Sequence, residues 1–440
     1  MRTTGTCGPL NEASEVLPAG SVAAISRAVS MTGLLIRRSA NVVLFLMLAC
    51  TQGDGHRPLT TSDPAPVWSA ETAWRLGEQP VVSIGPGNLR DRPEGRPLDP
   101  VTIFQTSDGR YVVSDGKMAG WHALLVYDHN GVFLQQLGRQ GEGPAEFGHH
   151  SYWAGEFRGD SIAGFDERLR RLQIWSADGQ FARTATLPSG SWPHFMSDGR
   201  MVIEQPPPLE TLRDLRRGTV AIRYNLHDRD GVFIRELMRI ERNLEEQSSP
   251  DSPNYAVRWI FAAGDSRWYV AEWSTFRVEV FDTTGSLLHV LERALPTVPF
   301  DSEEQEEIIQ IRLKWAGFGA EGVRGAAISE LEKTLRRNAR WPAQKPAIQA
   351  VLEDELGNTW VQHYYFMFGA LAHPADGRPV VWSVFDPAGT FLGDVTMPGR
   401  FTARSITATS VLGLWTDNDD VRHALVYDLI KPGSEPSPGH

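Results

Sequence analysis

One pattern recurs along the chain from about residue 80 onward and constrains its fold more than any other feature. A strand-like run ends in a short polar stretch and a glycine, and a second strand-like run follows. The copies read LLVYDHNGVFL, LQIWSADGQFA, IRYNLHDRDGVFI, VEVFDTTGSLL and WSVFDPAGTFL, with glycines at Gly131, Gly179, Gly231, Gly285 and Gly389. These glycines are 48, 52, 54 and 104 residues apart. The repeating unit is therefore about 50 residues long.

A second set of turns precedes the first in each unit. It reads SDGRYVV, RGDSIAGF, SDGRMVI, AGDSRWYV and ELGNTWVQ, with a sixth copy, ATSVLGLW, that lacks the glycine at the turn. Asp-Gly and Gly-Asp steps between apolar runs are typical of hairpins, because these residues tolerate positive φ. Each unit thus contains four antiparallel strands. Six such units predict an all-β fold, a six-bladed β-propeller over residues 78–431.

The last unit, around HALVYDLIKPG, has no strong fourth strand. The segment EQPVVSIGPG precedes the first unit and has strand character. We expect Val81–Ile84 to supply the missing strand and close the ring, because blades bury their faces only by stacking around a closed circle.

The interval of 104 residues contains the only helical patterns. The segment from Phe300 begins with Ser302 and has Gln305 three residues later, which is a capping-box pattern. Apolar Ile308, Ile311 and Trp315 follow at helical spacing, and a second segment repeats this with Ile328, Leu331 and Leu335. We predict a small helical insertion, residues 301–342, between blades four and five.

The N-terminal region has the pattern of a targeting signal. Arg37 and Arg38 precede the apolar run 42–49, which ends at Cys50. The run resembles the lipobox of bacterial lipoproteins, which implies lipidation of Cys50; a plain secretory signal or a short anchor is the alternative. We expect the signal at 31–49, an over-extended start before Met31, a flexible tether at 51–77 and a disordered tail at 432–440.

The net charge of the whole chain is −11. A nucleic-acid partner is not expected, because that function needs a basic face. The two cysteines, Cys7 and Cys50, both lie before the propeller, so no cysteine zinc site is available there.

The stretch LGRQGEGPAEF, Leu137–Phe147, connects the first two predicted blades. It has no following helix and no Lys-Ser/Thr pair, so it is not a phosphate loop. It resembles the connection of NHL-type repeats and the GRxGEGPxEF segment of bacterial six-bladed propeller lipoproteins. That resemblance covers residues 78–431 and implies a lipid-anchored propeller of the bacterial cell envelope.

Candidate site residues follow from loop length. The connections between second and third strands, and between blades, hold almost all the extra length, so we expect the binding face there. The ends of the second strands should ring its mouth, with Asp115, Asp166, Glu204, Glu272, His363 and Asp417. The competing interpretation is that these side chains bond turn amides. Candidate rim residues are Arg139, Glu142, Trp121, Trp273, Tyr364 and Trp415.

These features predict a binding or scaffold module rather than an enzyme, with no cofactor. Its partner would be a peptide, a glycan or an envelope protein, and it would touch the membrane only through the lipid. The alternative is a metal-dependent hydrolase or lactonase of the six-bladed type. That enzyme class requires a divalent cation such as calcium, held by Glu, Asn and Asp, and Asn is missing from the matched strand ends.

Overall fold

The protein is described by a computed structural model that covers fourteen stretches of the chain. They are residues 63–85, 98–116, 123–148, 153–157, 161–188, 192–196, 198–205, 219–243, 259–318, 326–338, 341, 344–364, 377–419 and 421–433. The predicted signal segment, Cys50 and Trp121 lie outside these ranges. So do residues 51–62 of the predicted tether and 434–440 of the predicted tail.

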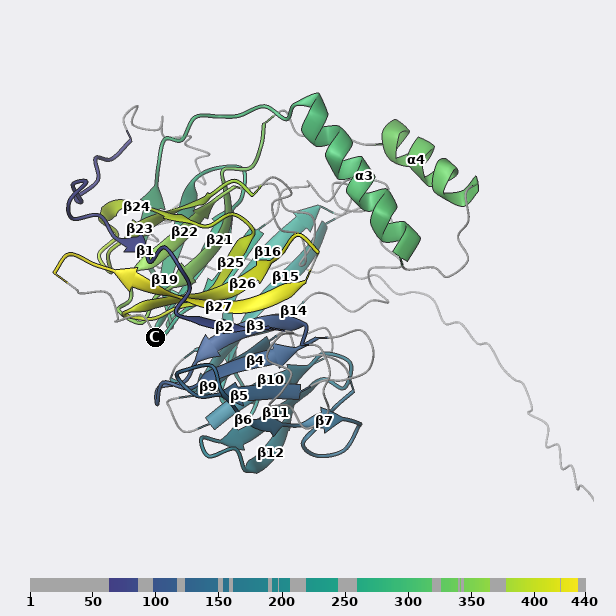
Figure 1. Ribbon diagram of the computed structural model, residues 1–440, viewed down its shortest axis with the longest axis vertical. Helices are drawn as coiled ribbons and strands as arrows, with labels where there is room; N and C mark the ends of the chain where they lie inside the picture. Colours follow the sequence, from purple (N-terminus) through teal and green to yellow (C-terminus); the bar gives the residue numbers. More distant parts are fainter. Residues whose placement is uncertain are drawn as a thin grey trace, which may run out of the picture. The chain divides into compact units, whose positions relative to one another are not determined.

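Six four-stranded antiparallel sheets form a ring, as predicted (Figure 1). Blade one contains β3 (Pro100–Gln105), β4 (Tyr111–Asp115), β5 (Ala123–Tyr127) and β6 (Phe133–Leu137). Blade two contains β9 (Trp153–Phe157), β10 (Ser161–Asp166), β11 (Arg171–Ser176) and β12 (Phe181–Thr186). Blade three contains β13 (Trp192–Phe195), β14 (Met201–Gln205), β15 (Thr219–His227) and β16 (Phe233–Asn243).

Blade four contains β17 (Trp259–Ala263), β18 (Arg267–Glu272), β19 (Arg277–Asp282) and β20 (Leu287–Glu292). Blade five contains β21 (Ile348–Glu353), β22 (Thr359–His363), β23 (Val380–Phe385) and β24 (Phe391–Met397). Blade six contains β25 (Phe401–Ile406), β26 (Ser410–Thr416) and β27 (Arg422–Ile430), and its outer strand comes from the N-terminal side of the propeller. The first strand of each blade, its inner strand, lies beside the inner strands of both neighbouring blades.

The five repeat glycines turn the chain between third and fourth strands. Their φ angles lie between 78° and 88°, a region that favours glycine. An aspartate three residues earlier fixes most of these turns. In blade four, Asp282 Oδ1 accepts the backbone N–H groups of Thr284 and Ser286 at 2.7 and 2.9 Å. The short polar stretch before each glycine is therefore the turn itself.

Six apolar clusters each contain residues from two neighbouring blades. Between blades three and four, the Tyr224 ring stacks on Phe261 at 4.3 Å, and Phe261 stacks on Trp268 at 5.8 Å. Trp268 is fully buried. Burying a large side chain of this kind stabilises the fold by about 1.5–3 kcal/mol. The ring is thus held together mainly across blade interfaces.

The ring closes through β1 (Arg75–Leu76) and β2 (Val82–Ile84), which both pair with β27. Val82 lies opposite Val426 and Ile84 opposite Ala424. The predicted closure by Val81–Ile84 is confirmed. β1 adds a second pairing on the same strand, so the closure begins earlier in the chain than residue 78.

Residues 63–77, within the predicted tether, lie against the propeller. The carboxylate of Asp63 binds the guanidinium of Arg293, with Oδ2 and Nη2 2.7 Å apart. The N–H of Trp68 donates to the carbonyl of Leu392 at 2.8 Å, along the edge of β24. We call residues 63–77 the strap.

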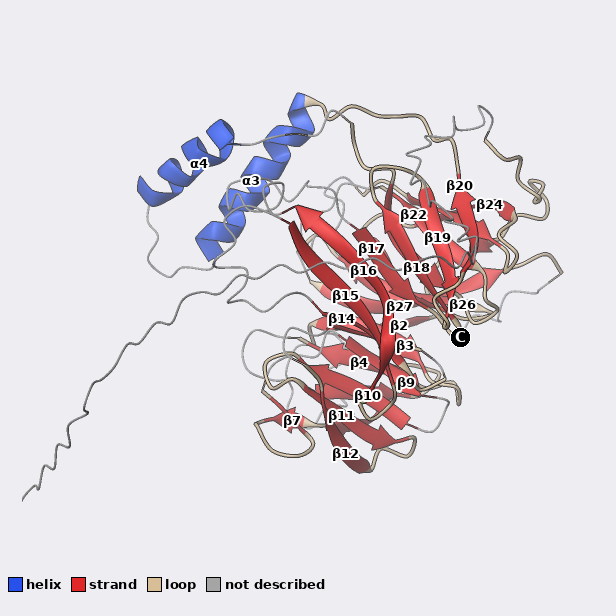
Figure 2. Ribbon diagram, turned by 180° about the vertical axis from the view of Figure 1, so that it is seen from behind, coloured by secondary structure: helices blue, strands red, loops and turns tan. Residues whose placement is uncertain are grey.

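The predicted insertion contains α3 (Ser302–Phe318) and α4 (Ala326–Asn338), the only helices within the described ranges (Figure 2). Ile309, Leu313 and Leu335 form the centre of their contact. The cap differs from the predicted Ser302–Gln305 box by one residue. Asp301 Oδ1 accepts the N–H of Glu304 at 2.8 Å, because the carboxylate stands just before the first helical residue. No described helix is long and apolar enough to cross a membrane.

Candidate functional site

A cavity lies between the inner strands of the six blades. Its volume is about 870 Å³, and strands β3, β9, β13, β17, β21 and β25 all line it, together with the turns that follow them. We call it the central cavity. Its wall contains apolar Phe104 and Leu352 together with polar His194, Glu156 and Arg404. The short turns between first and second strands line one end of it, including Ser107, Asp265 and Thr407.

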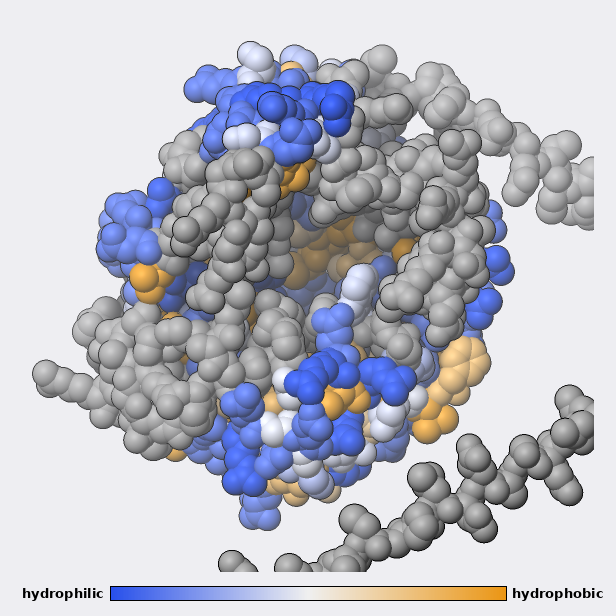
Figure 3. All heavy atoms as spheres, turned by 90° about the vertical axis from the view of Figure 1, so that its right-hand side faces the viewer, coloured by the Kyte–Doolittle hydropathy of each residue, from blue (hydrophilic) through white to orange (hydrophobic). Residues whose placement is uncertain are grey.

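The long connections were expected to carry the binding face, and many of their residues lie outside the described ranges. Figure 3 shows a hollow in one face of the molecule. Of the side chains that the structure describes there, apolar ones lie at the bottom of the hollow and mostly hydrophilic ones lie above and below it. The geometry of a site can therefore be built in detail only around the central cavity and the strand ends.

Three predicted mouth residues bond backbone amides. Asp115 Oδ1 accepts the N–H of Asp99 at 3.1 Å. Asp166 accepts the N–H groups of Gly148 and Leu169 at 2.5 and 2.9 Å. Asp417 Oδ1 accepts those of Asp419 and Val421, both at 2.9 Å. These hydrogen bonds hold the pKa of Asp417 below its usual range, the bond from Val421 most of all. The contacts match the turn-bonding interpretation.

The other three mouth residues also end second strands. Glu204 is buried on β14, and Glu272 accepts the Ser274 hydroxyl at 2.5 Å. His363 Nε2 lies 2.7 Å from Ser383 Oγ, which in turn donates to Asp394 Oδ1 at 2.8 Å. Each of the six predicted mouth residues lies at or beside the end of the second strand of a different blade. A ligand-binding role for this set stays a prediction.

Ser383, His363 and Asp394 have the composition of a nucleophilic triad but not its geometry. In such a triad the carboxylate bonds the imidazole nitrogen that faces away from the serine. Here Asp394 accepts from Ser383 itself, and Ser383 is completely buried. Burial lowers the pKa of His363. The cluster also binds Arg293, so it holds the strap in place.

The predicted rim residues lie in three places. Arg139 and Glu142 belong to the glycine-rich connection, where Arg168 pairs with Glu142 at 2.5 Å. Trp273 and Tyr364 are in ring contact at 6.4 Å, between blades four and five. Trp415 packs against His423 on blade six at 5.6 Å. The two aromatic contacts are packing between or within blades.

The glycine-rich connection binds its own carboxylate. Glu146 Oε2 accepts the N–H of Gly143 at 2.8 Å, and Glu146 Oε1 accepts Arg139 Nε at 2.8 Å. The bond from Gly143, and then that from Arg139, lowers the pKa of Glu146. A Cβ at Gly141 would collide with Glu146 Oε2. The space beside these glycines is therefore filled from within, which agrees with the turn interpretation.

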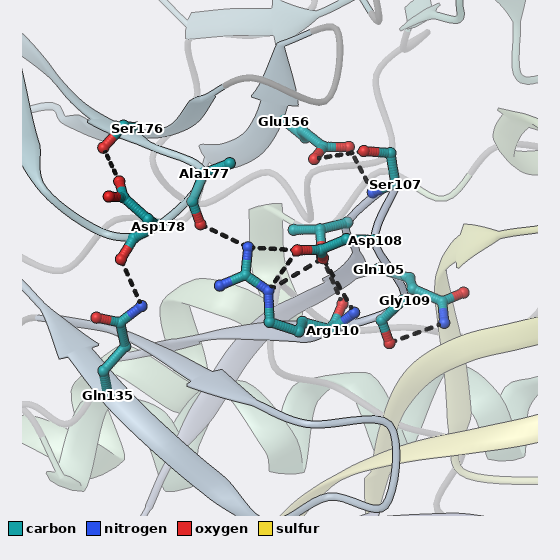
Figure 4. A network of polar contacts seen from close by, with 11 residues as sticks. Gln105, Ser107, Asp108, Gly109, Arg110, Gln135, Glu156, Ser176, Ala177 and Asp178 are labelled. Atoms are coloured by element: carbon teal, nitrogen blue, oxygen red, sulfur yellow. Dashed lines mark hydrogen bonds and ion pairs between the residues drawn. The ribbon is translucent and has the colours of Figure 1, made fainter.

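Carboxylates in the cavity wall bond the turn of the preceding blade. Glu156 on β9 accepts the N–H of Ser107 at 2.8 Å and its hydroxyl at 3.1 Å (Figure 4). Glu353 on β21 accepts the N–H of Asp265 at 3.0 Å in the same way. Burial raises the pKa of both carboxyls. Each acid therefore joins two blades at the cavity.

Two nitrogen side chains in the cavity wall were not predicted. Burial lowers the pKa of His194 to about 4, so its imidazole is neutral at pH 7. Arg404 on β25 lines the cavity and is exposed to it. One sequence signal could have identified both residues. Each is a charged or titratable residue inside a short first strand, WPHF or FTARSI, whose neighbours are mainly apolar.

In the described part of the chain, no three His, Cys, Asp or Glu side chains cluster closely enough to hold a metal ion. The carboxylates predicted at the mouth are on separate blades, and several are committed to backbone amides.

No protein-family model matches the chain, and no curated protein sequence matches it. Solved structures do. A protein from Bacteroides fragilis described as exported has 11% identity and a TM-score of 0.47, over 84% of this chain and 99% of that chain. A DUF4221 family member from Bacteroides vulgatus has 9% identity and a TM-score of 0.41, over 82% and 99%. Hsv2 from Kluyveromyces lactis has 10% identity and a TM-score of 0.34, over 76% and 99%. At such identities the likeness is one of fold alone, and membership of the propeller lipoproteins stays a prediction.

Proposed function

We propose that this chain is a binding module of the bacterial cell envelope and that its ligand enters the central cavity. The observation that carries the proposal is the cavity itself, about 870 Å³ in volume and lined by all six inner strands. Small-molecule sites usually have volumes of about 300–1,000 Å³. The wall of the central cavity presents polar and apolar groups in similar measure. A peptide or glycan segment fits this description.

Hydrogen bonds between neighbouring blades hold the wall of the central cavity rigid. The Ser107–Glu156 and Asp265–Glu353 bonds fix the turns at the cavity opening to the next blade. Binding to a preorganised wall avoids the entropy cost of ordering loops. An envelope protein, the other proposed partner, would contact the outer connections instead.

We infer the location of the protein in the cell from its N-terminal sequence. The signal at 31–49 and the lipobox-like Cys50 favour export and lipidation. Wild type should incorporate a labelled fatty acid and sediment with membranes. Cys50→Ser should lose both properties while the propeller keeps its melting temperature. Labelling of Cys50→Ser at the wild-type level would refute the lipid anchor.

The cavity proposal is tested by filling the cavity. Thr102 lies on β3 in the wall, and Leu288 lies on the outer strand β20 with half its surface exposed. Wild type, Thr102→Trp and Leu288→Trp are incubated with envelope extract, washed and denatured, and released molecules are identified by mass spectrometry. Wild type and Leu288→Trp should release the same molecule and Thr102→Trp should not. Equal release from all three variants would exclude the cavity.

A further inference from the structure

Arg404 is the extra residue of a β-bulge in the wall of the central cavity. Ala403 pairs with Gly413 and Ser405 with Leu412, so Arg404 has no partner residue on β26. Bulges redirect a side chain and often stand beside functional sites. The bulge and the exposure of Arg404 together place a guanidinium at the cavity.

No carboxylate among the described residues pairs with Arg404. Three of the acids that line the cavity have other partners, and one of them, Glu355, accepts the N–H of Ala408 at 2.9 Å. Glu156 binds Ser107, and Glu353 binds the N–H of Asp265 and the hydroxyl of Tyr269. The neighbouring Arg422 is already neutralised by Asp99, with Nε and Oδ1 2.7 Å apart. Among the described residues of the cavity wall, Arg404 is therefore a cation without a counter-ion.

Arg404 is exposed to the cavity, where wall groups replace part of the water around its guanidinium and leave its charge available to a ligand. Desolvation by the cavity wall lowers the pKa of Arg404 to about 10, and the positive charge of Arg422 contributes in the same direction. The guanidinium is therefore still a cation at neutral pH. An anionic ligand group that enters the cavity would pair with this charge.

We infer that Arg404 binds the carboxylate of the ligand that enters the central cavity; this rests on the proposed function and specifies its ligand. A guanidinium binds a carboxylate through two parallel N–H···O bonds. A monoanion balances the single charge of Arg404. A phosphate dianion would exceed it, beside the acidic groups Glu156 and Glu353. The carboxylate belongs either to a small organic acid or to a peptide C-terminus.

The test uses fluorine NMR with two probes. One is para-fluorobenzoate, and the other is a tripeptide that ends in para-fluorophenylalanine with a free carboxylate. Each probe is paired with its own amide, which has the same shape and no charge. The proteins are wild type, Arg404→Gln, Arg404→Lys and the control Arg337→Gln, which removes an equal charge from the exposed last turn of α4. Inorganic phosphate is titrated as a competitor at constant ionic strength.

Wild type and Arg337→Gln should bind at least one carboxylate probe, at least about tenfold more tightly than its amide. Arg404→Gln should lose that preference, and Arg404→Lys should keep part of it. The probe that binds more tightly identifies the source of the carboxylate. Because the substitution removes an unpaired charge, Arg404→Gln should melt at or above the wild-type temperature, which shows that it is folded.

Three results would overturn the inference. They are that no carboxylate probe binds wild type, that Arg404→Gln keeps the preference for the carboxylate, or that phosphate binds wild type more tightly than either carboxylate probe does. None of these results removes the proposed function. A molecule released by wild type and not by Thr102→Trp would still place a ligand in the cavity, but one that Arg404 does not bind.

Discussion

Asp63 and Arg293 are 230 residues apart in the chain and form a two-point ion pair, with Oδ2–Nη2 at 2.7 Å and Oδ1–Nε at 3.2 Å. The Arg293 side chain is only 8% exposed. It also donates to Ser383 Oγ at 2.7 Å and binds Asp394 at 2.6 Å. The strap is therefore attached to the propeller through a buried cation.

Asp63→Asn should lower the free energy of unfolding by about 1–3 kcal/mol, because a charge-assisted pair to a buried guanidinium is lost. Glu142→Gln removes an exposed pair with Arg168 and should cost no more than about 1 kcal/mol. Urea unfolding of both variants measures the difference. Equal effects would show that the strap does not stabilise the propeller.

Ring closure has its own test. Ile84 on β2 is completely buried, and Val81 just before it is 44% exposed. Ile84→Ala should cost about 2–5 kcal/mol through the cavity it leaves, and Val81→Ala should cost under about 1 kcal/mol. The transition of Ile84→Ala should remain a single one, because opening the ring exposes two blades at once. Unchanged melting of Ile84→Ala would contradict closure through β2.

The repeat glycines were predictable because their requirement is local. A hairpin of this kind needs positive φ at one position, and the sequence repeats that position. Closure was predictable because the last repeat visibly lacks a strand. The Asp63–Arg293 pair has no such signal: it depends on which residues the finished ring brings together. The cap at Asp301 was missed by one residue, since Asp301 and Ser302 are both good capping residues.

Much of the site could not be predicted for the same reason. The strand-end acids were found by alignment of the repeats, but their partners are amides several residues away. Arg404 lies in a strand whose bulge appears only when β25 pairs with β26. Its lack of a counter-ion depends on Glu156 and Glu353 being bound elsewhere. The sequence pattern predicts which residue types occupy which positions. The hydrogen bonds and ion pairs between those residues depend on the fold.

Positive φ itself can be tested at two glycines. Gly285 has a φ of 86° and an added Cβ would meet nothing closer than 3.7 Å, so only backbone strain opposes a side chain there. Gly285→Ala should cost about 1–2 kcal/mol. Gly77 does not have positive φ and has similar space around it. Gly77→Ala should be nearly neutral, and thermal melting of the two variants distinguishes them. A neutral Gly285→Ala would mean that the turn relaxes.

His194 makes stability depend on pH. Burial lowers its pKa from 6.5 to about 4 in the folded protein. The unfolded chain therefore binds a proton first as the pH falls. Its contribution is fully present above pH 6.5 and is lost between there and about pH 4, by on the order of 1–3 kcal/mol.

His194→Gln should show a smaller loss of unfolding free energy between pH 7 and pH 4.5 than wild type. Urea titrations at the two pH values measure it. His129→Gln, at an exposed position in the turn after β5, is the matched control for replacing a histidine by glutamine. The same decrease in His194→Gln as in wild type would assign the pH dependence to other groups.

Hydrogen exchange with the molecule captured from envelope extract tests the central claim most directly, because it reports where the ligand lies. The account predicts slower exchange in the turns that open onto the central cavity, including Ser107, Asp265 and Thr407, with little change in α3 and α4. Protection confined to the long connections or to the two helices, with the cavity turns unchanged, would contradict it.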